Sequence, residues 1–179
     1  MEKIKLSGSV GYVYKVFIES LKKAGIETTS GALNEKSVLI AIPYEKLANE
    51  LTVEINKELW ELKIKNGKMF LVGMRELVDE DVKKVNTQIL GKLKKYNIDA
   101  GAYVTDDGNA VVMVSLNDVV MRILENTLNE TKKRAGNHMR TLRVKFGNDE
   151  KYGYVVLYTK SERSKDDIMK KVEEMLGNE

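Results

Sequence analysis

The spacing of hydrophobic residues predicts a helix at the start of the chain, followed by strands and a second helix. Val10, Val13, Tyr14, Phe17 and Leu21 recur at intervals typical of one face of a helix. A short apolar run then indicates a buried strand, and alternating residues further on indicate a hairpin. The corresponding segments are the strand at 38–42, the second helix marked by Tyr44, Leu47, Ala48 and Leu51, and a hairpin that turns at Asn66-Gly67.

This pattern occurs twice along the chain, because residues 21–51 align with 93–123 without a gap, 72 positions apart. Within the alignment, apolar positions match apolar positions and lysines match lysines. The clearest pairs are Leu21-Lys22-Lys23 with Leu93-Lys94-Lys95, 38–42 with 110–114 and, downstream, 62–67 with 142–147. The chain is therefore predicted to consist of two tandem copies of one α-β-β-α-β-β unit.

The two copies predict an α+β fold with antiparallel sheets related by a pseudo-two-fold axis. Repeat 1 spans about 8–74 and repeat 2 about 79–160. Ser164 starts a capping-box pattern, so a closing helix is predicted over about 164–177. No linker rich in proline or serine separates the halves, so we expect residues 1–179 to form a single pseudo-symmetric domain, to which residues 1–6 add a short edge strand.

Individual residues predict where the helices end and where the hairpins turn. Gly25 and Asn97 occupy matching places just after the first helix of each copy, and these residue types best tolerate a left-handed C-cap. Asn66-Gly67 lies between two predicted strands, and Asp107-Gly108 is typical of a type I′ hairpin turn. The turn before the strand at 38–42 is predicted at Asn34-Glu35.

Composition narrows the class of protein. Hydrophobic residues make up 42% and charged residues 32% of the chain, which is ordinary for a compact soluble protein. No apolar run approaches the roughly 18 residues needed to span a bilayer, and the N-terminus lacks the apolar core of a signal peptide. We therefore expect a cytoplasmic protein with no membrane partner. The absence of cysteine excludes disulfides and cysteine-ligated metal sites.

Positive charge is concentrated in one segment of the second copy. Residues 131–147 hold six lysines and arginines, one histidine and no acid, whereas the rest of the chain holds 24 basic residues against 27 acidic ones. The net charge of +3 therefore comes entirely from residues 131–147, which we call the basic segment. Its basic residues are Lys132, Lys133 and Arg134 on a predicted loop, Arg140, and Arg143 and Lys145 on one face of a predicted strand.

The first copy repeats the basic strand face, since Lys63 and Lys65 alternate there with core residues. Two such faces would form a positive sheet surface suited to a phosphate backbone. The sequence thus favours a non-enzymatic nucleic-acid-binding protein, for DNA or RNA. The residues predicted to contact phosphates are Lys63, Lys65, Lys132, Lys133, Arg134, Arg140, Arg143 and Lys145.

Two other interpretations of these residues stay open. In the first, the basic side chains solvate an open sheet face and compensate the C-terminal end of a helix. In the second, the exposed sheets pair with another copy of the chain or with a protein partner, as in an assembly module without a nucleic-acid partner. Binding to phosphates should weaken steeply with salt, whereas a hydrophobic subunit interface should not.

The order α-β-β-α-β-β, twice in a chain of this length, resembles the LAGLIDADG homing-endonuclease fold. In that family, two such halves form a saddle whose sheets sit in the DNA major groove, and an acidic metal ligand precedes a glycine at the end of each first helix. The matching stretches here are 24–31, with Ser30 in place of the acid, and 96–101, with Asp99 one residue out of register with Gly101. The resemblance implies a binding protein without cleavage, and a metal-dependent endonuclease is the third alternative.

No other pattern supports catalysis. His138 is the single histidine and is expected to be solvated or to contact a nucleic-acid backbone rather than act as a base. Gly8 and Gly11 precede a helix, but a phosphate loop needs more glycines and a preceding buried strand. Tyr12 and Trp60 are predicted core residues. We expect no catalytic residues, no metal ligands and no cofactor.

Overall fold

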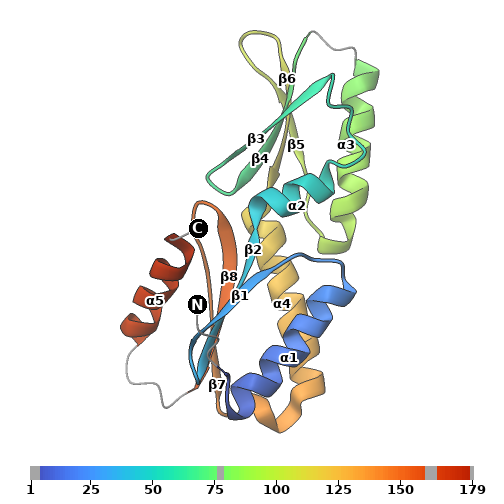
Figure 1. The fold of residues 1–179 in the computed structure, drawn as a ribbon. Helices are drawn as coiled ribbons and strands as arrows, with labels where there is room; N and C mark the ends of the chain where they lie inside the picture. The colour runs from blue at the N-terminus through green and yellow to red at the C-terminus, as the bar shows by residue number, and fades with distance from the viewer. Residues whose placement is uncertain (1–4, 76–78, 160–164, 178–179) are drawn as a thin grey trace. The chain divides into compact units, whose positions relative to one another are not determined.

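The computed structural model of the chain describes residues 5–75, 79–159 and 165–177. Within these residues, the order α-β-β-α-β-β occurs twice and a last helix follows (Figure 1). The helices are α1 (Gly8–Lys23), α2 (Tyr44–Leu51), α3 (Asp79–Leu93), α4 (Leu116–Ala135) and α5 (Lys165–Gly177), with short 3-10 helices η1 (Lys94–Tyr96) and η2 (Gly136–Met139). The strands are β1 (Thr29–Asn34), β2 (Ser37–Pro43), β3 (Trp60–Lys65), β4 (Lys68–Gly73), β5 (Gly101–Val104), β6 (Ala110–Ser115), β7 (Leu142–Asn148) and β8 (Tyr152–Thr159). The predicted fold class, two tandem repeats with a closing C-terminal helix, is confirmed.

The strands form two four-stranded antiparallel sheets, and each sheet combines one hairpin from each copy. Sheet 1 has the strand order β1-β2-β8-β7, and sheet 2 has the order β3-β4-β6-β5. The hairpin β1-β2 of the first copy thus pairs with β7-β8 of the second copy, and β3-β4 pairs with β5-β6. Neither copy builds a sheet from its own strands alone.

The two sheets place equivalent strands in equivalent positions. Strands β2 and β6, which align in sequence, are both central. Ile40 on β2 pairs with Val155 on β8, and its equivalent Val112 on β6 pairs with Leu71 on β4. All four side chains are completely buried. The prediction that 38–40 and 110–112 are equivalent central strands is therefore confirmed.

The residues predicted to be left-handed lie just after the helices. Gly25 has φ +73° and follows α1. The amide of Gly25 donates to the carbonyl of Lys22 at 3.0 Å, and the amide of Ile26 donates to the carbonyl of Leu21 at 3.0 Å, which together form a Schellman motif. Asn97 has φ 58° and takes the same role after η1. Both C-cap predictions are confirmed.

The three short hairpin turns differ in how well their sequences predicted them. Asn66 and Gly67 both have positive φ, 52° and 72°, as a type I′ turn requires. At Asp107-Gly108 the type I′ prediction is wrong, because Gly108 (φ 84°) alone has a positive φ and its amide closes a turn onto the carbonyl of Thr105. The first hairpin turns one residue later than predicted, because Asn34 pairs with Ser37 across the turn.

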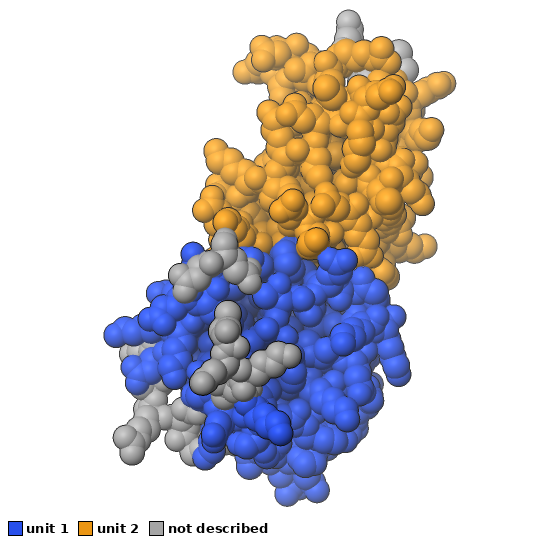
Figure 2. Space-filling view, in the orientation of Figure 1, with its two compact units in different colours: residues 1–43, 123–148, 152–179 blue, residues 44–122, 149–151 orange. Residues whose placement is uncertain are grey.

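The chain divides into two compact units, each built around one sheet. Unit 1 comprises residues 1–43, 123–148 and 152–179 and contains sheet 1, and unit 2 comprises residues 44–122 and 149–151 and contains sheet 2 (Figure 2).

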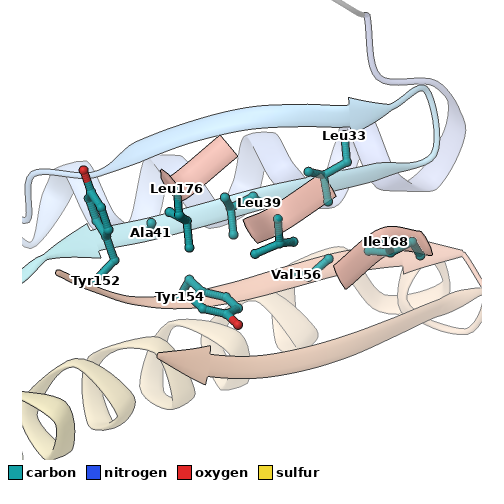
Figure 3. Close-up of a cluster of buried hydrophobic side chains, with 9 residues drawn as sticks. Leu33, Leu39, Ala41, Tyr152, Tyr154, Val156, Ile168 and Leu176 are labelled. Carbon is teal, nitrogen blue, oxygen red and sulfur yellow. The ribbon is translucent and has the colours of Figure 1, made fainter. Parts of the chain in front are cut away.

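In unit 1, α5 covers one face of sheet 1. Ile168, Val172 and Leu176 of α5 belong to one buried cluster with residues of β1, β2 and β8. Figure 3 shows the α5 side chains facing the strands. The strand members of the cluster are Leu33, Leu39, Ala41, Tyr152, Tyr154 and Val156. Helix α1 lies on the other side of sheet 1 from α5 (Figure 1), and Val13 and Phe17 are among its buried residues.

In unit 2, the C-terminal ends of α2 and α3 lie close together, because Nζ of Lys92 on α3 donates to the carbonyl of Glu50 on α2 at 2.9 Å. The inward residues of α3, Val85, Ile89 and Leu93, are buried. The turn of the β3-β4 hairpin is fixed against the start of α4. The amide of Asn117 donates to the carbonyl of Gly67 at 3.0 Å, and the hydroxyl of Tyr44 donates to the Asn117 side chain.

Two sequence predictions fall wholly or partly outside the described residues. The edge strand predicted over 1–6 involves residues 1–4, and the described Lys5 and Leu6 have no regular structure. The capping box predicted at Ser164 also lies outside the described residues. None of the helices in the described part of the chain is both long enough and apolar enough to cross a membrane.

Candidate nucleic-acid interface

The first three basic residues of the basic segment lie on a helix, not on the predicted loop. Lys132, Lys133 and Arg134 form the last turn of α4, which continues to Ala135. Lysine and arginine in this position compensate the negative end of the helix dipole. The loop prediction is wrong because small and polar residues, rather than large apolar ones, continue the buried stripe of α4.

The buried stripe is extended by threonines. The side chains of Thr127 and Thr131 are buried, and their hydroxyls donate to the carbonyls of Ile123 and Thr127 at 2.8 and 2.7 Å. Each hydroxyl is thus satisfied by the preceding helical turn and can be buried at little cost. Ala135, which is 4% exposed, completes the stripe. The basic side chains are thereby held on the solvent side of a regular helix.

The middle of the basic segment is fixed to α1 by an aromatic stack. His138 on η2 stacks on Tyr12 with ring centroids 4.3 Å apart and an interplanar angle of 29°. Nδ1 of His138 also lies 3.2 Å from Oγ of Ser9. Tyr12 was predicted as a core residue, but it is 45% exposed and forms this contact instead. The other aromatic core prediction, Trp60, is confirmed by its 1% exposure.

One basic side chain of α4 is partly neutralised. The guanidinium of Arg134 forms an ion pair with Glu19 on α1 at 3.3 Å. Within the described residues, no ion pair involves Lys132, Lys133 or Arg140, and all three are exposed. The available positive charge of this region therefore comes mainly from these three side chains.

The last two basic residues of the segment lie on the edge strand β7. Arg143 pairs with Tyr158 and Lys145 pairs with Val156, so both point to the face of sheet 1 that α5 covers. Arg143 is exposed, whereas Lys145 is half-buried. Because α5 covers this face over β1, β2 and β8, the predicted open basic face of sheet 1 is reduced to the β7 edge. Arg143 reaches solvent at the edge of the sheet, beside the helix.

The basic residues of the first copy, Lys63 and Lys65, are exposed on β3 in unit 2. Lys63 pairs with Phe70 and Lys65 pairs with Lys68 on β4. The six residues of the basic segment all belong to unit 1. The eight predicted site residues are thus divided between the two units, and within unit 1 Arg143 and Lys145 point to the face of sheet 1 that α5 covers.

The residues of the LAGLIDADG resemblance lie on the surface of unit 2 and after α1. Asp99 is exposed and lines a shallow depression of about 440 Å³ beside α3. Ser30 on β1 shares a hydrogen bond with the hydroxyl of Tyr14 at 2.6 Å. Across the ranges that the structure describes, no group of three or more histidine, aspartate and glutamate side chains has an arrangement that could hold a metal ion.

Sequence reasoning missed the α1 contribution to the site. Ser9, Tyr12 and Glu19 contact η2 or α4. Their spacing places them away from the apolar face of α1. A tyrosine outside the apolar positions of a helix is the sequence signal that could have indicated a contact there.

Comparison with known proteins identifies a viral relative. The chain is 63% identical over 179 residues to the uncharacterized protein 34 of Sulfolobus islandicus filamentous virus (isolate Iceland/Hveragerdi), and the match covers all of both chains. The crystal structure of AFV1-102, a protein from the Acidianus Filamentous Virus 1, matches 87% of this chain and all of its own at 17% identity, with a TM-score of 0.27. A TM-score this low supports no argument about fold or function. No protein-family model matches the chain.

Proposed function

This chain belongs to the same family as the uncharacterized protein 34 of Sulfolobus islandicus filamentous virus, and we propose that it binds nucleic acid, without catalysis, through the basic segment of unit 1. The observation that carries the proposal is the position of the positive charge. Lys132, Lys133 and Arg140 are exposed close together in sequence, on α4 and immediately after η2, in a segment that contains no acid.

The geometry of α4 and η2 suits contacts to phosphates. Lysines on the last turn of a helix have long side chains that reach outward from a fixed backbone. The stack of His138 on Tyr12 fixes η2 to α1, so Arg140, which directly follows η2, starts from an ordered position. A backbone that is already ordered loses less conformational entropy on binding than a flexible loop does.

Phosphate contacts give affinity without sequence information, so the proposal concerns binding of a phosphate backbone and not base recognition. Arg143 extends the basic segment along the edge of sheet 1, and Lys145 contributes less because it is half-buried. Arg134 contributes less because Glu19 already pairs with it. Lys63 and Lys65 remain candidate phosphate contacts of unit 2, but the proposal rests on the unit 1 residues.

The resemblance to the LAGLIDADG family agrees with a nucleic-acid partner only in the order of elements. Each sheet here combines hairpins from both copies, which departs from two halves that each carry their own sheet. Ser30 and Asp99 do not supply a pair of acids at matching positions. We therefore propose binding and not metal-dependent cleavage for this chain.

The proposal is tested by the salt dependence of binding to mixed-sequence duplex DNA and single-stranded RNA. The test compares the wild type with the triple variant Lys132→Gln, Lys133→Gln, Arg140→Gln. For duplex DNA, each neutralised phosphate contributes about −0.9 to the slope of log affinity against log salt. Loss of three contacts should therefore flatten the slope by up to about 2.7.

The matched control is the triple variant Lys83→Gln, Lys84→Gln, Lys94→Gln, which removes three exposed lysines from unit 2. It changes the net charge by the same amount and should leave the slope nearly unchanged. Equal losses in both variants would show that binding depends on net charge alone. No detectable binding by the wild type at low salt would reject the proposal.

A further inference from the structure

Because of the internal repeat, residues of sheet 1 have equivalents at matching positions in sheet 2. The two sheets differ in how one of their faces is covered. In sheet 1, Leu39 and Ala41 on β2 lie beside Val156 and Tyr154 on β8. These four side chains are buried together with residues of α5 (Figure 3). This face of sheet 1 therefore packs against the amphipathic helix α5.

The same four places in sheet 2 are also apolar. Leu39 and Ala41 align with Val111 and Met113 on β6. Val111 pairs with Val72 on β4, and Met113 pairs with Phe70. Directly paired residues of antiparallel strands lie on the same face, so these four residues form one continuous apolar surface. We call Phe70, Val72, Val111 and Met113 the open face.

The open face is less covered than the opposite face of sheet 2. Phe70, Val72 and Met113 of the open face are half-buried and Val111 is 3% exposed, whereas Met69, Leu71, Val112 and Val114 on the opposite face are completely buried. Within the described part of unit 2, the helices that bury residues are α2, α3 and the start of α4, where Leu116, Val119 and Val120 are buried. Unit 2 has no described helix in the position that α5 holds in unit 1.

We propose that the open face binds an amphipathic helix of a partner protein, with apolar residues at i, i+4 and i+8 and acidic residues along one edge. The apolar spacing is that of Ile168, Val172 and Leu176, which fill the equivalent face of unit 1. This interaction surface lies in unit 2 and does not depend on the nucleic-acid function proposed for unit 1.

The acidic edge of the partner helix follows from the charge beside the open face. Lys63 and Lys65 on β3 and Lys68 on β4 share this face of sheet 2, against one acid, Glu61. All three lysines are exposed. A helix seated on the open face would place one long edge beside these lysines, and acidic residues there would complement them.

The position of the helix is restricted from the side of β5. In unit 1 the helix approaches closely over Gly31 on β1, where a Cβ atom would lie 3.0 Å from Met175 of α5. Gly31 aligns with Tyr103, which is 49% exposed on β5 and pairs with Val111. Tyr103 therefore has a large side chain at the place where Gly31 leaves room for α5. A partner helix must therefore seat nearer to β4 and β3, where the lysines lie.

The test uses the full chain and two stapled helical peptides as probes. Both peptides carry the Ile, Val and Leu of α5 at the spacing of residues 168, 172 and 176. The acidic probe has glutamates along one edge, and the basic probe has lysines at the same places. Binding is measured by fluorescence anisotropy of labelled peptide. We expect the acidic probe to bind roughly tenfold more tightly than the basic probe.

Two variants locate the binding surface. Val72→Asp places a charge in the open face and should abolish binding of both probes, and Val53→Asp, at a 69% exposed residue of unit 2, is its control. The double variant Lys63→Glu, Lys65→Glu changes two exposed residues, so the fold is retained, and it should reverse the preference to the basic probe.

Three results would overturn the proposal. One is the absence of binding by either probe at peptide concentrations up to the millimolar range. Another is an unchanged preference between the probes in the double variant Lys63→Glu, Lys65→Glu. The third is a wild-type dimer in sedimentation equilibrium that Val72→Asp converts to a monomer, since a second copy would then occupy the open face.

Discussion

Tyr12 on α1 and His138 on η2 stack with their ring centroids 4.3 Å apart, although they lie far apart in sequence. The contact joins the first helix of the first copy to the basic segment of the second copy within unit 1. We therefore expect this contact to affect both the stability of unit 1 and the order of the proposed interface.

Replacing either ring should weaken both properties. Tyr12→Ala and His138→Ala should each lower the free energy of unfolding, with a coupling of about 0.5–1.5 kcal/mol between them in a double-mutant cycle. Denaturant unfolding of the four proteins measures the coupling. Tyr103→Ala, at a tyrosine of similar exposure in unit 2, is the control and should show no coupling to His138→Ala. A coupling near zero for Tyr12 would mean that the stack does not hold η2.

Two glycines should respond to alanine with opposite signs. Gly67 has φ +72°, and the side chain of Asn117 fills the place that a Cβ would take, so Gly67→Ala should destabilise the protein by about 1–3 kcal/mol. Gly91 lies in α3 with a negative φ and no atom within 4 Å of a Cβ, so Gly91→Ala should stabilise by about 0.5–1 kcal/mol. Thermal and denaturant unfolding of both variants checks the two signs. A neutral Gly67→Ala would contradict the described packing of Asn117.

The helix α5 should contribute strongly to the stability of unit 1. Ile168 is 4% exposed within the cluster beneath α5, so Ile168→Ala should cost about 2–5 kcal/mol of unfolding free energy. Lys170→Ala, at an exposed position of the same helix, is the control and should change stability by less than about 0.5 kcal/mol. If both variants unfold alike, α5 does not cover sheet 1 in the manner described.

The sequence predicted the elements and their ends well, for local reasons. Gly25 and Asn97 are the residue types that adopt left-handed conformations, and both do so after their helices. Asn66-Gly67 forms its type I′ turn because both residues tolerate positive φ. The run at 38–42 is apolar at every position, which indicated a strand buried on both faces. Each of these features depends on a few neighbouring residues and can be read without knowing the tertiary structure.

The pairing of strands between copies could not be predicted in the same way. Strand β2 could pair with β4 of its own copy or with β8 of the other copy, and both present short apolar runs to it. Ile40 pairs with Val155 and not with Leu71, yet either partner would be buried equally well. A hydrophobic pattern specifies which side of a strand is buried but not which equivalent strand lies beside it.

The error at Lys132–Arg134 has a different cause. The stripe of large apolar residues in α4 ends at Leu128, and the helix continues because Thr131 and Ala135 are small enough to be buried in the same line. Threonine is read as polar in a hydrophobicity pattern, although its hydroxyl is satisfied within the helix. The charge pattern alone identified the candidate residues. Their position on a helix could not be predicted, because it depends on the buried small and polar residues that continue α4.

Each sheet combines one hairpin from each copy, and this pairing predicts how fragments of the chain behave. Residues 1–78 and 79–179, expressed separately, should not form folded monomers, because β2 and β4 would each lose a central partner. Mixed together, the two fragments should form a one-to-one complex with the circular dichroism spectrum of the intact chain. Size-exclusion chromatography with light scattering measures both outcomes. A folded monomer of residues 1–78 would contradict the pairing of hairpins between the two copies.

The central claim, that unit 1 binds nucleic acid through its basic segment, is tested most directly by lysine-reactivity footprinting. The protein is modified with a lysine-specific reagent, with and without saturating mixed-sequence DNA or RNA, and each lysine is quantified by mass spectrometry. We predict strong protection of Lys132 and Lys133, with Lys83 and Lys84 on α3 unchanged as internal controls. Equal reactivity of Lys132 and Lys133 in the bound and free protein, at a concentration where binding is saturated, would contradict the claim.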